Sequence, residues 1–244
     1  MNIYSHQQQQ IRVAATNSMA IIAGGTSEQK AALRDTLLPR LDQASPLLCE
    51  VAASCFSRSL AHDLVVDGDF IRLFRILQNK DARVRGPIIV ELRDYIQGSD
   101  EKARRFLVDA GILPAILPTE SNQIKDDLLS FMTTCVLPIL GPSFTQSNGG
   151  STLFPLLTNE DSRIRTAGIQ ALKNAVDSRH GNVGNMVKAG IVETLHPLTA
   201  TNEAVQDLWC RILPKVAPLL TNRTEVDILF ENLKYVVMVV AQRI

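Results

Sequence analysis

NKDARVR at residues 79–85 returns as NEDSRIR at residues 159–165, 80 residues further along the chain. Both copies keep an asparagine, an aspartate and two arginines at the same places, with a β-branched apolar residue between the arginines. A phrase that recurs at a fixed step is typical of a repeat protein, in which each copy marks the same point of a structural unit. The step is twice 40 residues, and about 40 is a common length for a helical repeat.

Apolar residues recur at steps of 39 to 41 residues along the chain. Five columns of such residues hold their register, which indicates one repeat array rather than unrelated domains. The columns are Leu33, Leu73, Leu113, Leu153, Val192; Leu37, Leu77, Leu117, Leu157; Ala44, Val84, Ile124, Ile164, Val205; Ala52, Leu92, Met132, Leu172, Leu213; and Phe56, Ile96, Val136, Val176, Ala217.

Each unit is predicted to be helical, because its apolar residues recur every four positions, as in Val84, Ile88, Leu92 and Ile96. A residue that can cap a free backbone N–H precedes this helix in four units. The caps are Asp81, Ser121, Asp161 and Asn202, and four residues later stand Arg85, Lys125, Arg165 and Gln206. We expect the pairs Asp81–Arg85 and Asp161–Arg165 to steady the first helical turn at i,i+4 spacing.

A glycine precedes the shorter helix of several units and permits either a sharp turn or a close approach of two helices there. These glycines are Gly68, Gly111, Gly190 and, in NGGSTL, Gly150. Together with RIRTAGIQALKNAVD at residues 163–177, this pattern resembles the armadillo repeat over about residues 20–220. The resemblance implies an all-α fold, a right-handed α-solenoid of about five repeats that each hold one short and two longer helices. HEAT repeats, with two helices per unit, are the structural alternative.

A repeat buries its apolar face only against its neighbours, so the ends of the array need caps. We expect an N-terminal tail and capping helix over residues 1–24, the repeat array over 25–220 and a C-terminal capping helix over 221–244, all in a single continuous domain. The C-terminal helix has a second interpretation, an interface for a copy of the chain or for a larger complex. Its apolar residues are Leu229, Leu233, Val236, Val237 and Val240.

Charge and motifs argue against several classes of function. In 244 residues, 25 basic side chains balance 25 acidic ones, so the chain lacks the basic excess of a general nucleic-acid binder. None of the four histidines stands at metal-ligand spacing from another ligand, and no nucleophile, phosphate-binding or dinucleotide-binding motif occurs. We therefore expect no catalytic residue, no metal and no cofactor.

The cysteines and the longest C-terminal apolar run are the basis for a prediction of where the protein is located in the cell. The four cysteines, Cys49, Cys55, Cys135 and Cys210, lie in apolar stretches without C-x-x-C spacing, which indicates packed thiols in a reducing compartment. YVVMVVA at residues 235–241 is too short to span a bilayer. We expect a cytoplasmic protein without a membrane partner, with the nucleus as the second choice.

The candidate binding residues come from the resemblance. In armadillo proteins the third helix of each unit lines a concave surface, and an asparagine near its end holds an extended peptide. Asn174 matches that asparagine. The equivalent residues in other units are Asp94, Thr134 and Lys215, and one turn earlier stand Gln170 and Arg211. By helical periodicity position 94 lies opposite the apolar arc, so this column should face solvent or ligand.

Nuclear-import adaptors of the armadillo family place a tryptophan one turn before the asparagine. Here that place holds Gln170, whereas Trp209 falls in the column of Ile88 and Leu128. We therefore expect Trp209 in the core, which argues against a receptor for nuclear-localisation signals.

The favoured hypothesis is a non-enzymatic scaffold that binds a protein or peptide segment on its concave face, as a monomer or weak homodimer. One alternative is an assembly subunit or an Hsp70 chaperone cofactor that acts through its ends. The other is a solenoid enzyme that acts on nucleic acid, although we expect no nucleic-acid partner.

Overall fold

The computed structural model describes residues 9–10, 13–14, 17–18, 21–22, 24–41, 58–79, 81–117, 124–147, 150–200, 202–220, 226–227 and 230. All regular secondary structure in these residues is helical, so the predicted all-α class is confirmed. The helices group into two compact units, residues 1–98 with 110–131 and residues 99–109 with 132–244. The predicted boundaries at residues 24 and 220 and the right-handed course stay predictions.

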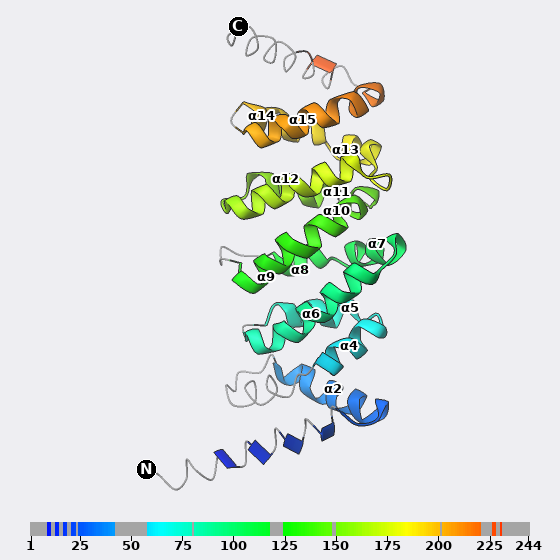
Figure 1. Cartoon of the computed structure of the whole chain (residues 1–244), viewed down its shortest axis with the longest axis vertical. Helices are drawn as coiled ribbons and strands as arrows, with labels where there is room; N and C mark the ends of the chain where they lie inside the picture. Colours follow the sequence, from blue (N-terminus) through cyan, green and yellow to red (C-terminus); the bar gives the residue numbers. More distant parts are fainter. Residues whose placement is uncertain are drawn as a thin grey trace, which may run out of the picture. The chain divides into compact units, whose positions relative to one another are not determined.

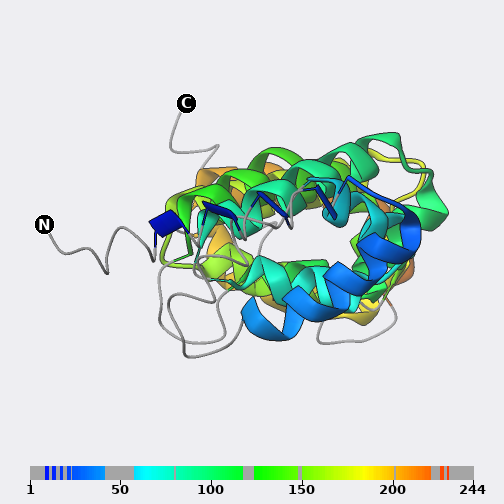
Figure 2. The ribbon, with the colours of Figure 1, turned by 90° about the horizontal axis from the view of Figure 1, so that it is seen from below.

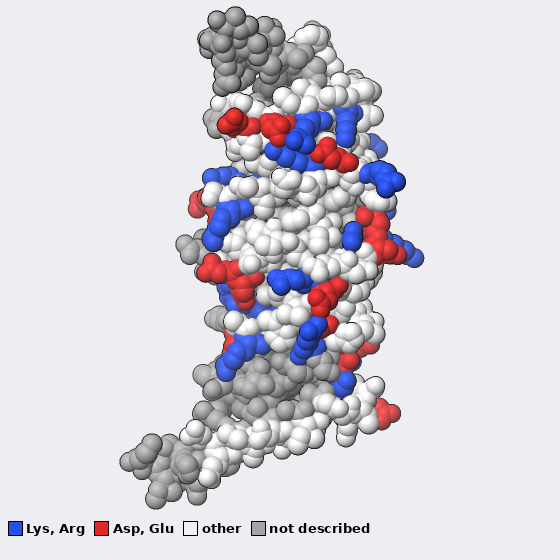
Figure 3. All heavy atoms as spheres, viewed as in Figure 1, with Lys and Arg blue, Asp and Glu red and all other residues white. Residues whose placement is uncertain are grey.

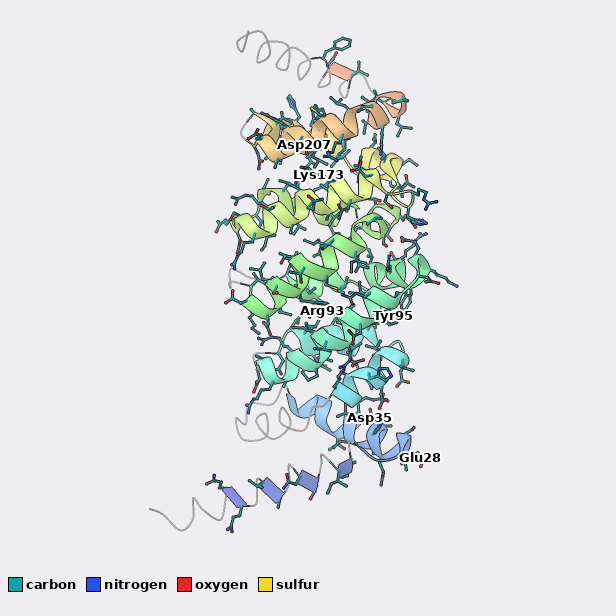
Figure 4. All side chains as sticks on the ribbon, viewed as in Figure 1. Glu28, Asp35, Arg93, Tyr95, Lys173 and Asp207 are labelled. Atoms are coloured by element: carbon teal, nitrogen blue, oxygen red, sulfur yellow. The ribbon has the colours of Figure 1, made fainter. Side chains whose placement is uncertain are left out.

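In the first unit, helix α6 (Ala82–Gly98) packs on α4 (Arg58–Val66) and α5 (Phe70–Leu77), and α5 also contacts α8 (Ile112–Ile116). The rings of Phe70 and Tyr95, whose centroids are 5.5 Å apart, join α5 to α6; Figure 4 labels Tyr95 on α6. Beside α6 lies α9 (Asp126–Phe131).

The first described long helix of this unit is α2 (Ser27–Leu41), which is drawn in blue in front of the cyan helices when the ribbon is seen from below (Figure 2). Ion pairs tie α2 to the segment of α4 and the turn that follows it. Lys30 lies 4.0 Å from Asp63, and Arg34 lies 2.6 Å from Asp67. The second contact is the firmer one, because it is short enough to be a hydrogen bond.

In the second unit, three long helices lie side by side, with α12 (Ser162–Asp177) between α10 (Leu137–Gln146) and α15 (Glu203–Val216), as Figure 1 shows. Shorter elements cover one side of these helices. They are α7 (Glu101–Asp109) on α10, η2 (Phe154–Thr158) on α12, α13 (Val183–Lys188) and α14 (Ile191–Thr199) on α15, with α11 (Gly150–Leu153) and the final turn η3 (Ala217–Leu219) beside them. The apolar core lies between these two layers.

Glycines and caps set the helix ends. Gly68, Gly111 and Gly190 have φ of 69°, 90° and 86°, the left-handed region in which an L side chain is strained, so the predicted turns are confirmed. Gly150 does not adopt this conformation. It is the first residue of α11 and has no positive φ, so its assignment to the same turn is wrong.

The N-caps are confirmed where they are described. The side chains of Asp81, Asp161 and Asn202 accept hydrogen bonds from backbone N–H groups two or three residues ahead. Ser121 lies outside the described residues. The caps hold α6, α12 and α15 at their first turns.

The predicted i,i+4 ion pairs are wrong, because each aspartate binds a nearer arginine. Asp81 Oδ2 lies 2.6 Å from Arg83 Nη2, and Asp161 Oδ2 lies 2.8 Å from Arg163 Nη2. The second arginine of each phrase reaches backward instead. Arg85 donates to the carbonyl of Asn79 and Arg165 to that of Asn159.

Most columns are buried, including Leu73, Leu113, Leu153 and Val192 at no more than 1% exposure. Trp209 is 2% exposed, so its prediction as a core residue is confirmed. The last unit departs from the predicted register. Leu213 is half-buried and Ala217 exposed, and Ile212 and Val216 take their places in the core, exactly one residue earlier. The step from Leu172 and Val176 is therefore 40 residues, not 41.

Residues Asp126–Gln146 form one helix of 21 residues, in which a π-helical turn, η1 (Met132–Val136), joins α9 to α10. By length and composition this helix could cross a membrane. However, 67% of its most apolar window is buried inside the protein, as expected for a core helix. The buried Cys135 lies on it, whereas Cys210 on α15 is exposed, so the expectation of packed thiols is wrong for Cys210. Cys49 and Cys55 lie outside the described residues.

Candidate functional site

The predicted binding residues lie on the long-helix face, which we define in each unit as the side of its long helices turned away from the short helices. The long helices are α6 in the first unit and α10, α12 and α15 in the second. Within each unit the column lies on this face because the core residues occupy the other side of each helix. None of its members is buried: Asp94, Thr134, Gln170, Arg211 and Lys215 are exposed, and Asn174 is half-buried. The structure thus gives these side chains access to solvent, and their role in binding stays a prediction.

On α12, the candidate asparagine is held at both ends of its amide. Gln170 Nε2 donates to Asn174 Oδ1 at 2.8 Å, and Asn174 Nδ2 donates to the carbonyl of Pro138 on α10 at 3.3 Å. The carbonyl is free to accept because a proline at position 142 has no N–H to donate to it. Asn174 therefore links two neighbouring long helices and has a fixed orientation.

Ion pairs link α12 to α15. Lys173 Nζ lies 2.7 Å from Asp207 Oδ2, and Figure 4 shows the two side chains from adjacent helices. Arg211 bonds to Asp177 at 3.1 Å and to Asp207 at 3.3 Å. The hydrogen bond from Lys173, with the charge of Arg211, holds the pKa of Asp207 below its usual range.

Lys215 makes a third link, because its Nζ donates to the carbonyl of Val176 at the end of α12. The corrected register changes its equivalence, however. With a step of 40 residues, Cys210 and Pro214 match Gln170 and Asn174, and both are exposed. Arg211 and Lys215 remain on the long-helix face one position further along.

In the first unit, Asp94 belongs to a charged cluster with Arg58, His62 and Glu91. Arg58 bonds to Glu91 and, at 2.6 Å, to Asp94, whereas His62 Nδ1 lies 2.9 Å from the other oxygen of Glu91. Burial opposes ionisation of the Glu91 carboxyl, yet the hydrogen bonds from Arg58 and His62 outweigh it and leave its pKa below the usual range. The two carboxylates in turn raise the pKa of Arg58, chiefly through the Glu91 hydrogen bond.

Sequence reasoning missed Arg58, Glu91, Lys173 and Asp207, because it followed only the column of Asn174 and the column one turn earlier. These residues come from a neighbouring column or from another helix. One signal was present: Lys173 and Arg93 are basic residues 80 apart that directly precede Asn174 and Asp94. Figure 4 labels Arg93 on α6.

Charge is unevenly distributed on the long-helix face of the second unit. Figure 3 shows acidic and basic side chains intermixed over α15, and mainly uncharged atoms over α10 and the adjoining part of α12. Thr134 lies in the π-helical turn η1, directly before α10. π-helical turns are often found at functional sites, because the extra residue redirects the side chains beside it.

The other predicted interface cannot be located. Leu229, Leu233, Val236, Val237 and Val240 lie outside the described residues, so the end-to-end interface stays a prediction. Within the described part of the chain, no group of three or more His, Cys, Asp or Glu side chains is arranged to hold a metal ion.

Several solved structures resemble the chain at low identity. A designed armadillo repeat protein in complex with the peptide (KR)4 is 18% identical, with a TM-score of 0.46 over 85% of this chain and 93% of that one. Computationally designed armadillo repeat proteins for modular peptide recognition give 18% identity and a TM-score of 0.44 over 86% and 94%. An engineered protein gives 22% and 0.44 over 85% and 90%. No protein-family model and no curated protein matches the chain.

Proposed function

We propose that this chain is a non-enzymatic scaffold that binds an extended segment of a partner protein along the long-helix face of the second unit. The observation that carries the proposal is the series of side-chain links between neighbouring helices on that face. Asn174 joins α12 to α10, and Lys173, Arg211 and Lys215 join α12 to α15. A surface that is already ordered loses less conformational entropy when it binds than a mobile surface does.

The linked side chains keep hydrogen-bonding capacity for a ligand. A guanidinium has five N–H donors, and Arg211 directs Nε to Asp207 and Nη1 to Asp177. Each amide oxygen and nitrogen of Asn174 makes one bond of the two that it can make. An extended peptide presents N–H and C=O groups at regular spacing, which suits a row of fixed donors and acceptors.

The charge pattern favours a protein segment over a polyanion. Carboxylates alternate with basic groups where α12 and α15 meet, as in Lys173 and Asp177 on α12 and Asp207 and Arg211 on α15. A nucleic-acid backbone would meet repulsion from these carboxylates and would gain little from a chain of zero net charge. A segment with mixed polar side chains meets no such penalty.

Peptides selected against the immobilised full chain from a random phage-displayed library test the proposal. We expect selected peptides to bind, by fluorescence anisotropy, at least about tenfold more weakly to the triple variant Gln170→Ala/Asn174→Ala/Arg211→Ala, since about 1.4 kcal/mol is tenfold. The matched control is Glu193→Ala, an exposed position on α14 in the short-helix layer. Circular dichroism checks that both variants stay folded.

Equal affinity of the triple variant and the parent chain for every selected peptide would contradict the proposal. Failure to select any peptide would contradict it as well, provided that the immobilised chain is folded. Reaction with the basic hollow described below is recognised separately, because it would respond to Arg105 and Arg179 and not to Asn174.

A further inference from the structure

A second surface feature lies away from the long-helix face, at one edge of the second unit. It is an open hollow of about 470 Å³ where the end of α10, helix α7 and the loop between α12 and α13 meet. Its polar lining comes from Arg105 on α7, Gln146 at the end of α10, and Arg179, His180 and Asn182 in the loop. Nothing in the repeat pattern predicts this concentration of basic groups.

Hydrogen bonds fix the loop that forms one wall of the hollow. Gln146 Nε2 donates to the carbonyl of His180 at 2.6 Å, and the backbone N–H of Asn182 donates to Thr145 Oγ1 at 3.0 Å. Asn185 then donates to the carbonyls of both Thr145 and Gln146. The loop is therefore fastened to the end of α10 and does not depend on a ligand for its shape.

Gly181 allows the loop to run this close to α12. A Cβ at this position would lie 1.6 Å from the carbonyl oxygen of Ala175, which is far inside contact distance and involves backbone on both sides. The residue must be glycine for the loop to keep this course. The first three residues of GNVGN, at 181–183, line the hollow, and the last three begin helix α13.

The hollow is basic within a chain of zero net charge. Arg105, one of the charged lining residues, lies 3.9 Å from Asp109 and keeps most of its N–H donors unused. Arg179, the other arginine, makes no side-chain hydrogen bond or ion pair within the described part of the chain. The nearby carboxylates are engaged elsewhere: Asp177 with Arg211, and Glu101 with Ser143. No carboxylate lines the hollow.

We propose that this hollow binds an anionic side chain of a partner protein segment, either a phosphorylated residue or a glutamate. Arginine presents a planar fork of donors that matches phosphate or carboxylate oxygens, and two such forks come here from different elements. The hollow is larger than a single oxyanion, so it also has room for the adjoining backbone of the segment. Recognition of acidic or phosphorylated motifs by arginine clusters is a common mode of peptide binding.

A nucleic acid fits the hollow less well. Single-stranded binding sites combine a basic track with aromatic rings on which the bases stack, and no Phe, Tyr or Trp lines this hollow. A duplex requires several phosphate contacts along a surface, whereas the basic groups here converge on one place.

Backbone amide shifts of the ¹⁵N-labelled full chain test the proposal. The probes are three peptides: Gly-Gly-phosphoserine-Gly-Gly, Gly-Gly-Glu-Gly-Gly and the uncharged Gly-Gly-Ser-Gly-Gly. We expect the phosphopeptide, the glutamate peptide or both to shift the amides of Arg105 and of residues 179–183, and the serine peptide to shift none of them. Which charged peptide binds more tightly distinguishes phosphate from carboxylate recognition.

Two double variants control for charge. Arg105→Gln/Arg179→Gln should weaken binding of the charged peptide at least about tenfold, because it removes both forks. Lys102→Gln/Lys188→Gln removes the same charge from exposed positions of the same unit outside the lining and should leave binding within about twofold. Both pairs are exposed, and an unchanged thermal unfolding midpoint verifies the fold.

The proposal is overturned if neither charged peptide shifts these amides, or if the two double variants weaken binding equally. It is also overturned if a single-stranded RNA dodecamer displaces the charged peptide and binds more tightly, since the surface would then recognise nucleic acid. These outcomes leave the long-helix face untouched, because that face is tested with other peptides and other variants.

Discussion

The two copies of the repeated phrase make the same internal hydrogen bonds but bind different partners outside the phrase. In each, the asparagine side chain accepts a hydrogen bond from the aspartate N–H, at 2.8 Å in NKDARVR and 2.9 Å in NEDSRIR. In each, the aspartate caps its helix and binds the nearer arginine, and the further arginine donates to the asparagine carbonyl. In both copies, hydrogen bonds between the asparagine, the aspartate and the two arginines hold the start of the helix.

The copies differ where they meet the next repeat. Arg85 is 4% exposed and also binds Asp127 at 2.8 Å, whereas the half-buried Arg165 adds only the carbonyl of Glu160. The residue 80 positions after Asp127 is Asp207, also an aspartate. Asp127 lies in the first turn of α9, but α15 begins at Glu203, so Asp207 lies a turn deeper and pairs with Lys173. The two aspartates therefore differ by about one turn in their distance from the start of the helix. This difference determines whether the aspartate pairs with Arg85 or with Lys173.

Arg85→Ala should have the largest effect on stability and should exceed Arg165→Ala. The first change removes the partner of Asp127 and one donor to the Asn79 carbonyl, to which Lys125 also donates. Breaking a buried pair costs about 3 kcal/mol at the lower end of its range, which suits the partly exposed Asp127. Loss of the Arg165 hydrogen bonds should cost about 1 kcal/mol. Urea unfolding of the full chain measures both.

Equal losses for the two arginines would contradict this account, because they would mean that the Asp127 pair contributes nothing. The double variant Arg85→Ala/Asp127→Ala sharpens the test. It should be less destabilised than the sum of the single variants, because neither charge is then left without its partner.

The helical class, the caps and most of the core could be predicted from the sequence, because they depend on local chemistry and period. The buried side chains of Val84, Leu92 and Ile96 follow from spacing alone. The partners of Arg85 and Asp207 could not be predicted, since they depend on where a helix of the next repeat begins. The shift from Leu213 to Ile212 arises within α15, where seven residues separate the buried Val205 from Ile212, whereas eight separate Ile164 from Leu172 in α12. Both spacings keep two residues on one face of a helix, so the period alone does not distinguish them.

The candidate site shows the same division. That Asn174 and Asp94 would escape burial follows from their position on the helix. That Asn174 is bound to Pro138 and that Asp94 is bound to Arg58 required the placement of neighbouring helices. The basic hollow joins three separate elements, so no single stretch of sequence indicated it.

The glycine turns of the two units can be compared for backbone strain alone, because glycine has no side chain. Gly111 in the first unit and Gly190 in the second have nearly the same φ, and no atom lies within 3.4 Å of a Cβ built on either. Alanine at either position should therefore cost about 1–2 kcal/mol from backbone strain alone. Thermal unfolding measures the two losses, and they should agree. A marked difference would show that one turn relaxes and that the two units do not share the same rigid turn.

Substitutions of the capping aspartates can distinguish the contribution of the capping hydrogen bond to stability from that of the carboxylate charge. Asp81→Ala should cost about 1 kcal/mol at neutral pH through loss of the cap. The pKa of Asp81 and that of Asp161 are lowered, chiefly by the hydrogen bonds from Arg83 and Arg163. The stabilisation is therefore present above the ordinary pKa of about 3.9 and is lost as the pH falls through the lowered value.

Urea unfolding midpoints between pH 7 and pH 3 should show the gap between the parent chain and Asp81→Ala narrowing toward acid. Asp161→Asn is the control in the other copy, since asparagine keeps the capping oxygen but does not titrate. A gap that stays constant down to pH 3 would mean that the ion pair with Arg83 contributes no stability.

The residue directly after each phrase gives the smallest expected effect. Gly86 lies inside α6 directly before Pro87, whereas the same position in α12 carries the side chain of Thr166 and is followed by Ala167. Glycine in a helix interior costs about 0.5–1 kcal/mol relative to alanine. A proline ring crowds the Cβ of the helical residue before it, so Gly86→Ala should recover little of that free energy, although no atom beyond the neighbouring residues and the helix backbone lies within 4 Å of the Cβ position. Thr166→Gly meets no proline and should lower the free energy of unfolding by about 0.3 kcal/mol. Urea unfolding measures both changes. A gain of the full amount, about 0.5–1 kcal/mol, from Gly86→Ala would contradict this account, because it would mean that α6 accepts a side chain before Pro87 without strain.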